Sequence, residues 1–254
     1  MFVSSVDWSG LLTNAATTSG CVNHASTPAK IAHEKIERNA GNLRIGLLAI
    51  AEQEWSVATE DSPGANPLDP IHFVRTLQKF RDSYDFLIVL LHSGIEQYPF
   101  PTPRQMETSR FIIEQGARVV ICQHSHCAGC YETYQSGHII YGQGNLIFDS
   151  PDQEQSWHEG FLVRLLINDD LSCEWQPIPY VQSESEAGAR RMPPERQRAF
   201  LKTLSERSIA IQEPGRIKAE WDKYCGERHH YFMSCMLGHN RLLRRLNRDS
   251  GAIA

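Results

Sequence analysis

The hydrophobic pattern divides the chain into an α/β part and a helical part that follows it. Short, continuous apolar runs at 43–50, 86–91 and 119–122 have the length and β-branched content of buried strands. Apolar residues at helical spacing lie between these runs, and the pairs Asp69-Pro70 and Thr102-Pro103 combine an N-cap residue with a proline suited to the first turn. The pattern therefore predicts strand–helix–strand units with parallel strands.

The two helices can be placed more closely. The first is expected to run from Pro70 to about residue 81, with Ile71, Val74 and Leu77 facing the core. The second should end near residue 115, where Gly116 supplies a C′ glycine. Its start, Thr102-Pro103-Arg104-Gln105, has the spacing of a capping box.

Strand pairs separated by turn residues are expected after the second helix. They are 131–134 with 138–141, and 160–167 with 173–180. The stretch 183–191 reads as a linker, and the pattern from residue 193 onward is helical. We therefore expect two domains, 1–182 and 183–254.

Histidines follow both central strands. His92 comes directly after the run 86–91, and His124 and His126 follow the run 119–122. Because ligands and metals collect at the carboxyl ends of parallel strands, these three imidazoles predict a metal site. The alternative is that His124 and His126 cap their strand and hydrogen-bond to loop carbonyls.

Three further polar residues are candidates for lining a pocket. Glu52 and Glu54 follow the first strand and would point the same way on an extended segment, where they could hold a metal-bound water or a basic substrate group. They could equally be a solvated acidic pair. Asn145 ends the glycine loop 142–145, which is either a tight turn or a loop whose N–H groups approach an anion.

Cys127 and Cys130 form a C-x-x-C motif beside these histidines. Together with Cys122 and the histidines they could form a small zinc knuckle, or the pair could be a redox dithiol. The third interpretation is that these small residues pack beneath the site.

Composition narrows the classes of protein. The 254 residues carry a net charge of −5, which provides no general basic field for nucleic acid. No apolar run approaches the length of a membrane span, and the segment after Met1 lacks the pattern of a secretory signal. Seven cysteines without a small-domain disulfide spacing favour reduced thiols. These features predict a cytoplasmic chain with no nucleic-acid partner and no transmembrane segment.

Five segments carry a resemblance to a known family. They are AEQEWSVA at 51–58, PGANPLDP at 63–70, VLLHSGIEQYPFPTP at 89–103, CQHSHCAGCYE at 122–132 and YGQGNLIFD at 141–149. In this order they resemble the CapA family, which is tied to bacterial capsule and poly-γ-glutamate synthesis and has a catalytic region similar to calcineurin-like metallophosphoesterases. The resemblance implies an α/β fold: a partial four-layer metallophosphoesterase-like sandwich, with mixed sheets flanked by helices and a helical C-terminal appendage.

The resemblance also implies a divalent metal, Mn, Zn or Fe, and metal-dependent hydrolysis at a phosphate, with two metals in a full-length form. By position, His92 and His124 would share one metal and His126 would serve the other. The family's Asp-bearing first motif, its bridging carboxylate and its Asn-His pair have no counterpart, and Asp7 is not one of those ligands. The chain thus resembles a member that lacks its N-terminal portion.

The matching histidines and the missing N-terminal ligands leave two functions open. The first is metal-dependent hydrolysis of a small-molecule or polymer substrate, by a chain that associates with itself or with the capsule-synthesis machinery. The alternative is a non-catalytic remnant or binding protein of the same fold. No residue is assigned a catalytic role.

Overall fold

The computed structural model describes residues 32–38, 41–52, 57–58, 64–148, 154–184 and 186–236. Its elements in chain order are β1 (Ala32–Arg38), β2 (Gly41–Ala51), α2 (Pro70–Phe80), the 3-10 turn η1 (Arg81–Ser83), β3 (Phe86–His92), α3 (Pro103–Glu114), β4 (Val119–Gln123), β5 (Tyr131–Tyr134), β6 (Gly137–Ile140), the 3-10 turn η2 (Gln155–His158), β7 (Glu159–Ile167), β8 (Cys173–Gln182), β9 (Ala189–Arg191), α4 (Pro194–Ala210) and α5 (Arg216–Met236).

The larger sheet has six strands in the order β1-β2-β3-β4-β6-β5. The inner strands β2, β3, β4 and β6 run parallel, whereas β1 and β5 pair antiparallel at the edges. The predicted strands of this sheet are confirmed. β1 was not predicted, because its sequence AHEKIER has neither an apolar run nor a strict alternation.

A second sheet has three antiparallel strands in the order β7-β8-β9. The predicted hairpin of β7 and β8 is confirmed. β9 lies within the stretch expected to be a linker, and Arg191 pairs with Tyr180 of β8. The stretch is therefore partly sheet, and the division into domains at residue 182 stays a prediction.

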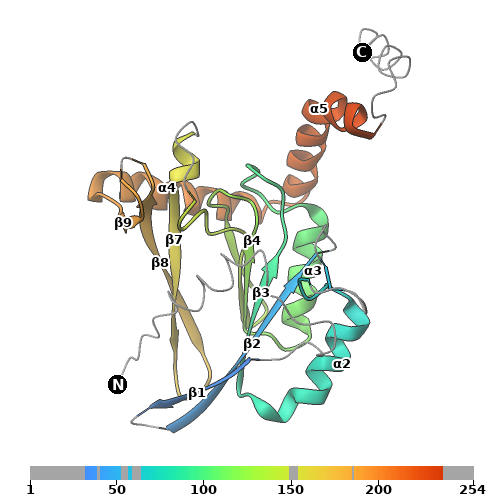
Figure 1. Ribbon diagram of the computed structural model, residues 1–254, viewed down its shortest axis with the longest axis vertical. Coiled ribbons are helices and arrows are strands. Elements are labelled where there is room, and N and C mark those ends of the chain that lie inside the picture. Colours follow the sequence, from blue (N-terminus) through green and yellow to red (C-terminus); the bar gives the residue numbers. More distant parts are fainter. Residues whose placement is uncertain are drawn as a thin grey trace.

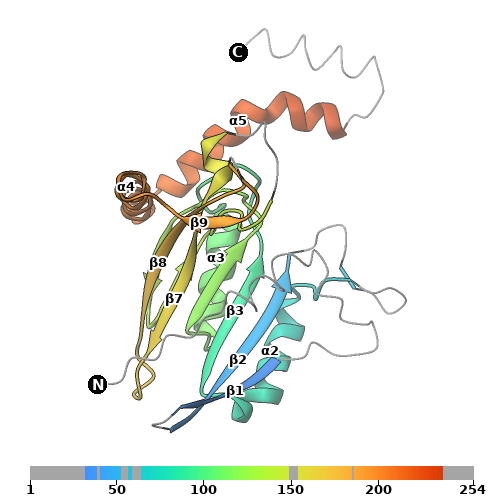
Figure 2. The same cartoon turned by 60° about the vertical axis from the view of Figure 1, so that its left-hand side comes forward.

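The larger sheet is buried on both faces. Helices α2 and α3 cover one face and the second sheet packs against the other (Figures 1 and 2). Along β3 the side chains alternate: Val89 and Leu91 face the helices, while Ile88 and Leu90 face the second sheet. Two buried faces explain why β3 reads as a continuous apolar run. The predicted α/β fold with mixed sheets flanked by helices is confirmed.

Helix α2 begins where its cap was predicted. Asp69 accepts a hydrogen bond from the N–H of His72 at 2.6 Å. The predicted inward position of Leu77 is confirmed, and Val74 packs partly buried against the same core. That of Ile71 is wrong, because its side chain is 65% exposed and Phe73 is buried instead. Phe73 and Leu77 are four residues apart on one helical stripe, and Ile71 lies about 200° around the helix from Phe73.

Helix α3 also begins at its predicted cap. Thr102 accepts from the N–H of Gln105 at 3.0 Å, and Gly116 takes a φ of 106° after the helix. The Gln105 amide serves another purpose than the expected capping box: its Nε2 donates to the carbonyl oxygen of Ser93 at 3.0 Å. This buried bond ties α3 to the segment that follows His92.

The helical C-terminal part contains α4 and α5. Phe200 and Leu204 of α4 join the core between the two sheets. Helix α5 is continuous from Arg216 to Met236, in agreement with the helical pattern predicted from residue 193 onward. Within the described ranges, no helix combines the length and the apolar character needed to cross a membrane.

Candidate metal centre

Three parallel strands end side by side at one edge of the larger sheet. In the register of β2, β3 and β4, Ala51 pairs with His92 and His92 pairs with Gln123. The backbone stays linked beyond these ends, since the N–H of Glu52 donates to His92 O at 3.0 Å and that of Ser93 donates to Gln123 O at 2.8 Å. The segments that follow β2, β3 and β4 are therefore hydrogen-bonded to one another where they leave the sheet.

The three predicted histidines meet at this edge. The ring centroids of His92 and His124 are 4.9 Å apart, and those of His124 and His126 are 5.8 Å apart. Two imidazoles that ligate one cation at about 2.0–2.1 Å place their centroids about 5 Å apart. The spacing of His92 and His124 thus fits a shared cation, whereas that of His124 and His126 is wider, and no group of three His, Cys, Asp or Glu in the described residues is arranged to hold a metal ion.

The backbone of the H-x-H segment is held in an uncommon conformation. His124 has a φ of 121° and His126 a φ of 54°, both in the region that favours glycine. Such residues cost of the order of 1–3 kcal/mol each and cluster at ligand sites and active sites. Between them, Ser125 Oγ donates to the carbonyl oxygen of Cys127 at 2.8 Å, which helps to hold the turn.

The ring of His126 is enclosed by groups from the following loop and η2. Trp157 stacks on it with centroids 5.2 Å apart and an interplanar angle of 23°, and Phe148 approaches edge-on at 5.4 Å. Asn145 Oδ1 lies 2.8 Å from His126 Nδ1. Asn145, predicted to line the pocket, is thus in direct contact with a predicted ligand.

The glycine loop 142–145 is a tight packing turn. Gly142 has a φ of 141°, and a Cβ there would lie 2.5 Å from Ser125 Oγ. Gly144 has a φ of 81°, and a Cβ there would lie 2.4 Å from the carbonyl oxygen of Glu159. Both positions therefore require glycine, which favours the turn interpretation over an anion-binding loop.

Of the two predicted acidic residues, Glu52 is among the described residues and Glu54 is not. Glu52 is half-buried directly after β2, next to the end of β3. Glu54 lies outside the described residues. The assignment of both to a pocket rim stays a prediction.

The cysteines near the histidines are buried free thiols. Burial raises the pKa of Cys122 to about 12 and that of Cys127 to about 11. Burial likewise raises the pKa of the Cys130 thiol. Because thiol exchange uses the thiolate, these buried thiols favour the packing interpretation over a redox dithiol.

Arg110 forms an ion pair with the buried Glu132, which lies in the segment that follows the H-x-H motif. Glu132 receives two hydrogen bonds from Arg110, from Nε at 3.0 Å and from Nη2 at 2.7 Å. The Tyr141 hydroxyl donates to Glu132 Oε1 at 2.5 Å, and burial together with this carboxylate raises the pKa of Tyr141. The contact joins the segment after the H-x-H motif to the start of the glycine loop.

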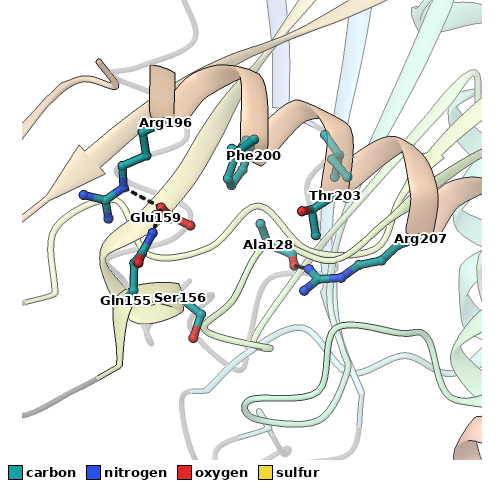
Figure 3. A pocket seen from close by; sticks show the side chains of 10 residues that line it. Ala128, Gln155, Ser156, Glu159, Arg196, Phe200, Thr203 and Arg207 are labelled. Atoms are coloured by element: carbon teal, nitrogen blue, oxygen red, sulfur yellow. Dashed lines mark hydrogen bonds and ion pairs between the residues drawn. The ribbon is translucent and has the colours of Figure 1, made fainter. Parts of the chain in front are cut away.

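Helix α4 borders a cavity of about 170 Å³ (Figure 3). Ala128, in the loop 124–130 that carries His124 and His126 (the histidine loop), also lines this cavity. At one end Arg196 pairs with Glu159 and Glu184. At the other, Arg207 Nη1 donates to the carbonyl oxygen of Ala128 at 2.7 Å. The arginines therefore fasten α4 to the second sheet and to the loop that carries His126.

Sequence reasoning missed Trp157, Phe148 and Gln105. Trp157 and Phe148 reach His126 only through the folded path of the chain, and no local pattern marks them. Gln105 stood in a recognised motif, but its amide bonds to Ser93 rather than to the helix cap.

The chain belongs to the family described as bacterial capsule synthesis protein PGA_cap, whose model matches residues 15–150. It is similar to the capsule biosynthesis protein CapA of Bacillus anthracis, with 26% identity over 153 residues, 57% of this chain and 36% of that protein. It is also similar to the PGA biosynthesis protein CapA of Bacillus subtilis (strain 168), with 30% identity over 92 residues, 36% of this chain and 24% of that protein. The resemblance to CapA is confirmed, and the chain spans about a third or less of these relatives.

Part of the chain is similar to two solved structures. A candidate 5′-nucleotidase of Staphylococcus aureus gives a TM-score of 0.38 at 13% identity, covering 68% of this chain and 33% of that one. The sulfate thiohydrolase SoxB of Thermus thermophilus gives a TM-score of 0.38 at 14% identity, covering 68% of this chain and 28% of that one.

Proposed function

We propose that this chain supplies the histidine part of a divalent-metal site in a protein of capsule or poly-γ-glutamate synthesis, and that the site serves hydrolysis of a phosphoester. The observation that carries the proposal is the proximity of His92 to His124 and of His124 to His126 at the ends of adjacent parallel strands. The metal is Mn, Zn or Fe. A cytoplasmic location, a small-molecule or polymer substrate, and association with itself or with the synthesis machinery belong to the same proposal.

The residues bring the right chemistry for part of such a site. Neutral imidazole is a common ligand of Zn and Fe, whereas Mn is better served by carboxylate, carbonyl and water oxygens. A bound cation of this kind acts as a Lewis acid and lowers the pKa of its bound water. The strained backbone of His124 and His126 supports the proposal independently, because strain of this kind is concentrated at ligand sites.

The test is metal content per folded chain, measured by elemental analysis after loading with Mn, Zn or Fe and removal of excess metal. The His92→Ala/His126→Ala double variant should lose the bound metal. A His72→Ala variant is the matched control, because His72 lies exposed on α2 and is not one of the three proposed ligands. Metal content that is equal in all three proteins would overturn the proposal.

A second candidate function is binding without hydrolysis. It is favoured by the ligand set: the three histidines offer nitrogen donors, and no carboxylate in the described residues completes a three-ligand group with them. The two functions separate in an assay of the metal-loaded protein with p-nitrophenyl phosphate and bis-p-nitrophenyl phosphate. Turnover that is lost in the double variant supports hydrolysis, whereas stoichiometric metal without turnover supports binding.

A further inference from the structure

The side chain of Asn145 makes three hydrogen bonds that fix its orientation. Its Nδ2 lies 3.2 Å from the carbonyl oxygen of His126 and 3.2 Å from that of Trp157. Both carbonyls only accept, so the NH₂ group must face them. A flipped amide would place its oxygen against two other oxygens, and the Oδ1 atom therefore faces His126 Nδ1, at 2.8 Å.

This orientation decides which nitrogen of His126 carries the proton. Asn145 Oδ1 only accepts, so Nδ1 must donate. In a neutral imidazole with its proton on Nδ1, the lone pair is on Nε2. We propose that Asn145 is a positioning residue that holds His126 as the Nδ1–H tautomer and leaves Nε2 as the donor atom of the ring.

The surroundings make this preference strong. Asn145 is 7% exposed, and Trp157 stacks on the His126 ring and Phe148 contacts it edge-on, so water competes poorly for the contact. The opposite tautomer would leave two acceptors facing each other at a hydrogen-bonding distance. An unsatisfied buried polar group costs about 1–3 kcal/mol, which corresponds to a tautomer ratio of about 5 to 160.

The consequence for the metal rests on the proposed function, whereas the tautomer itself does not. If His126 serves a cation, it does so through Nε2. A hydrogen bond to the other ring nitrogen fixes ring orientation and raises the basicity of the ligating atom, and loss of such a partner costs roughly 10–100-fold in metal affinity.

The tautomer can be read directly by long-range ¹H–¹⁵N NMR of metal-free protein labelled at histidine, at about pH 8.5, where imidazoles are neutral. Two other histidines of the protein serve as internal references for the two tautomers. His158 Nδ1 lies 3.1 Å from the carbonyl oxygen of Gln182 and must be Nδ1–H. His138 Nε2 lies 2.8 Å from the carbonyl oxygen of Cys173 and must be Nε2–H. We expect the His126 pattern to match that of His158.

Two variants distinguish an effect of Asn145 on the His126 tautomer from a general structural role in the loop. Asn145→Asp and Asn145→Ala both lose the Nδ2 donor, and Asn145→Asp also turns an oxygen toward the carbonyls of His126 and Trp157, so it disturbs the loop at least as much. Only Asn145→Ala loses the acceptor. Asn145→Asp should therefore keep the Nδ1–H pattern, and Asn145→Ala should shift His126 toward the His138 pattern while the two reference residues stay unchanged. A shift of equal size in both variants would overturn the proposal.

The wild-type spectrum tests the proposed Nδ1–H tautomer even if the Asn145→Ala chain fails to fold. An Nε2–H pattern for His126 would overturn the proposal. Metal affinity of the two variants then tests the consequence, with a loss of about 10–100-fold expected for Asn145→Ala alone. A wild-type protein that shows Nδ1–H and binds no metal supports the Asn145 assignment and contradicts the proposed function.

Discussion

The hydroxyl of Tyr141 donates to the same carboxylate oxygen of Glu132 that accepts from Arg110 Nε. Glu132 is 6% exposed and Tyr141 is 2% exposed, so the carboxylate and the hydroxyl lie inside the protein, whereas the Arg110 side chain is 36% exposed. These contacts connect α3, β5 and the residue that follows β6. The two segments that carry much of the family resemblance are therefore held together by one side chain from each.

The first prediction is that Tyr141→Phe destabilises the fold. The change removes a donor from a buried carboxylate, and a hydrogen bond to a charged group contributes about 1.5–3 kcal/mol. We expect a loss of about that size in the free energy of unfolding, measured by urea denaturation. The matched control is Tyr134→Phe, whose hydroxyl donates to the exposed Glu114 at 2.8 Å and should change stability by about 0.5 kcal/mol or less. Equal losses in the two variants would contradict the role given to Glu132.

The second prediction concerns stability at alkaline pH. Burial raises the folded-state pKa of Cys122 to about 12, so the unfolded chain releases this proton first. The resulting stabilisation is present below the unfolded pKa and is lost as the pH rises toward the folded pKa. Between about pH 8.5 and 10.5 the wild type should lose about 2 kcal/mol more than a Cys122→Ala variant. Parallel stability curves for the two proteins would rule out this contribution.

The third prediction concerns how α4 is fastened to the histidine loop. Arg207→Met keeps the aliphatic stem and removes the bond to Ala128 O. We expect faster hydrogen exchange in α4 and in the loop around Ala128, measured by mass spectrometry. Arg198→Met on the same helix is the control, because Arg198 pairs only with the exposed Glu195 among the described residues. Protection that falls equally in both variants would show that Arg207 has no special role.

Local patterns predicted much of the fold. The runs that became β3 and β4 and the caps at Asp69 and Thr102 depend on nearby residues alone. The meeting of His92 with His124 was also predictable, because parallel neighbouring strands end at one edge.

Features that depend on distant contacts could not be predicted in the same way. The inward stripe of α2 is set by the sheet it packs on, which is why Phe73 is buried and Ile71 is exposed. The stacking of Trp157 on His126 depends on the path of the chain through β5 and β6 and on to η2. β9 is too short for a period-2 pattern and exists only through its pairing with β8.

The last prediction concerns Gly142, where a positive φ and a close contact coincide. An alanine there would adopt a φ of 141° and place its Cβ 2.5 Å from Ser125 Oγ, in the middle of the H-x-H segment. Gly116 offers a control that isolates the contact, since it has a φ of 106° and a Cβ there would meet nothing within 4 Å. Both alanine variants carry backbone strain of about 1–3 kcal/mol, but only Gly142→Ala must also displace Ser125. We therefore expect the larger loss of stability and a loss of metal binding in Gly142→Ala, with unchanged metal binding in Gly116→Ala. If Gly142→Ala folds and binds metal as the wild type does, the position of Ser125 has no influence on the neighbouring histidines.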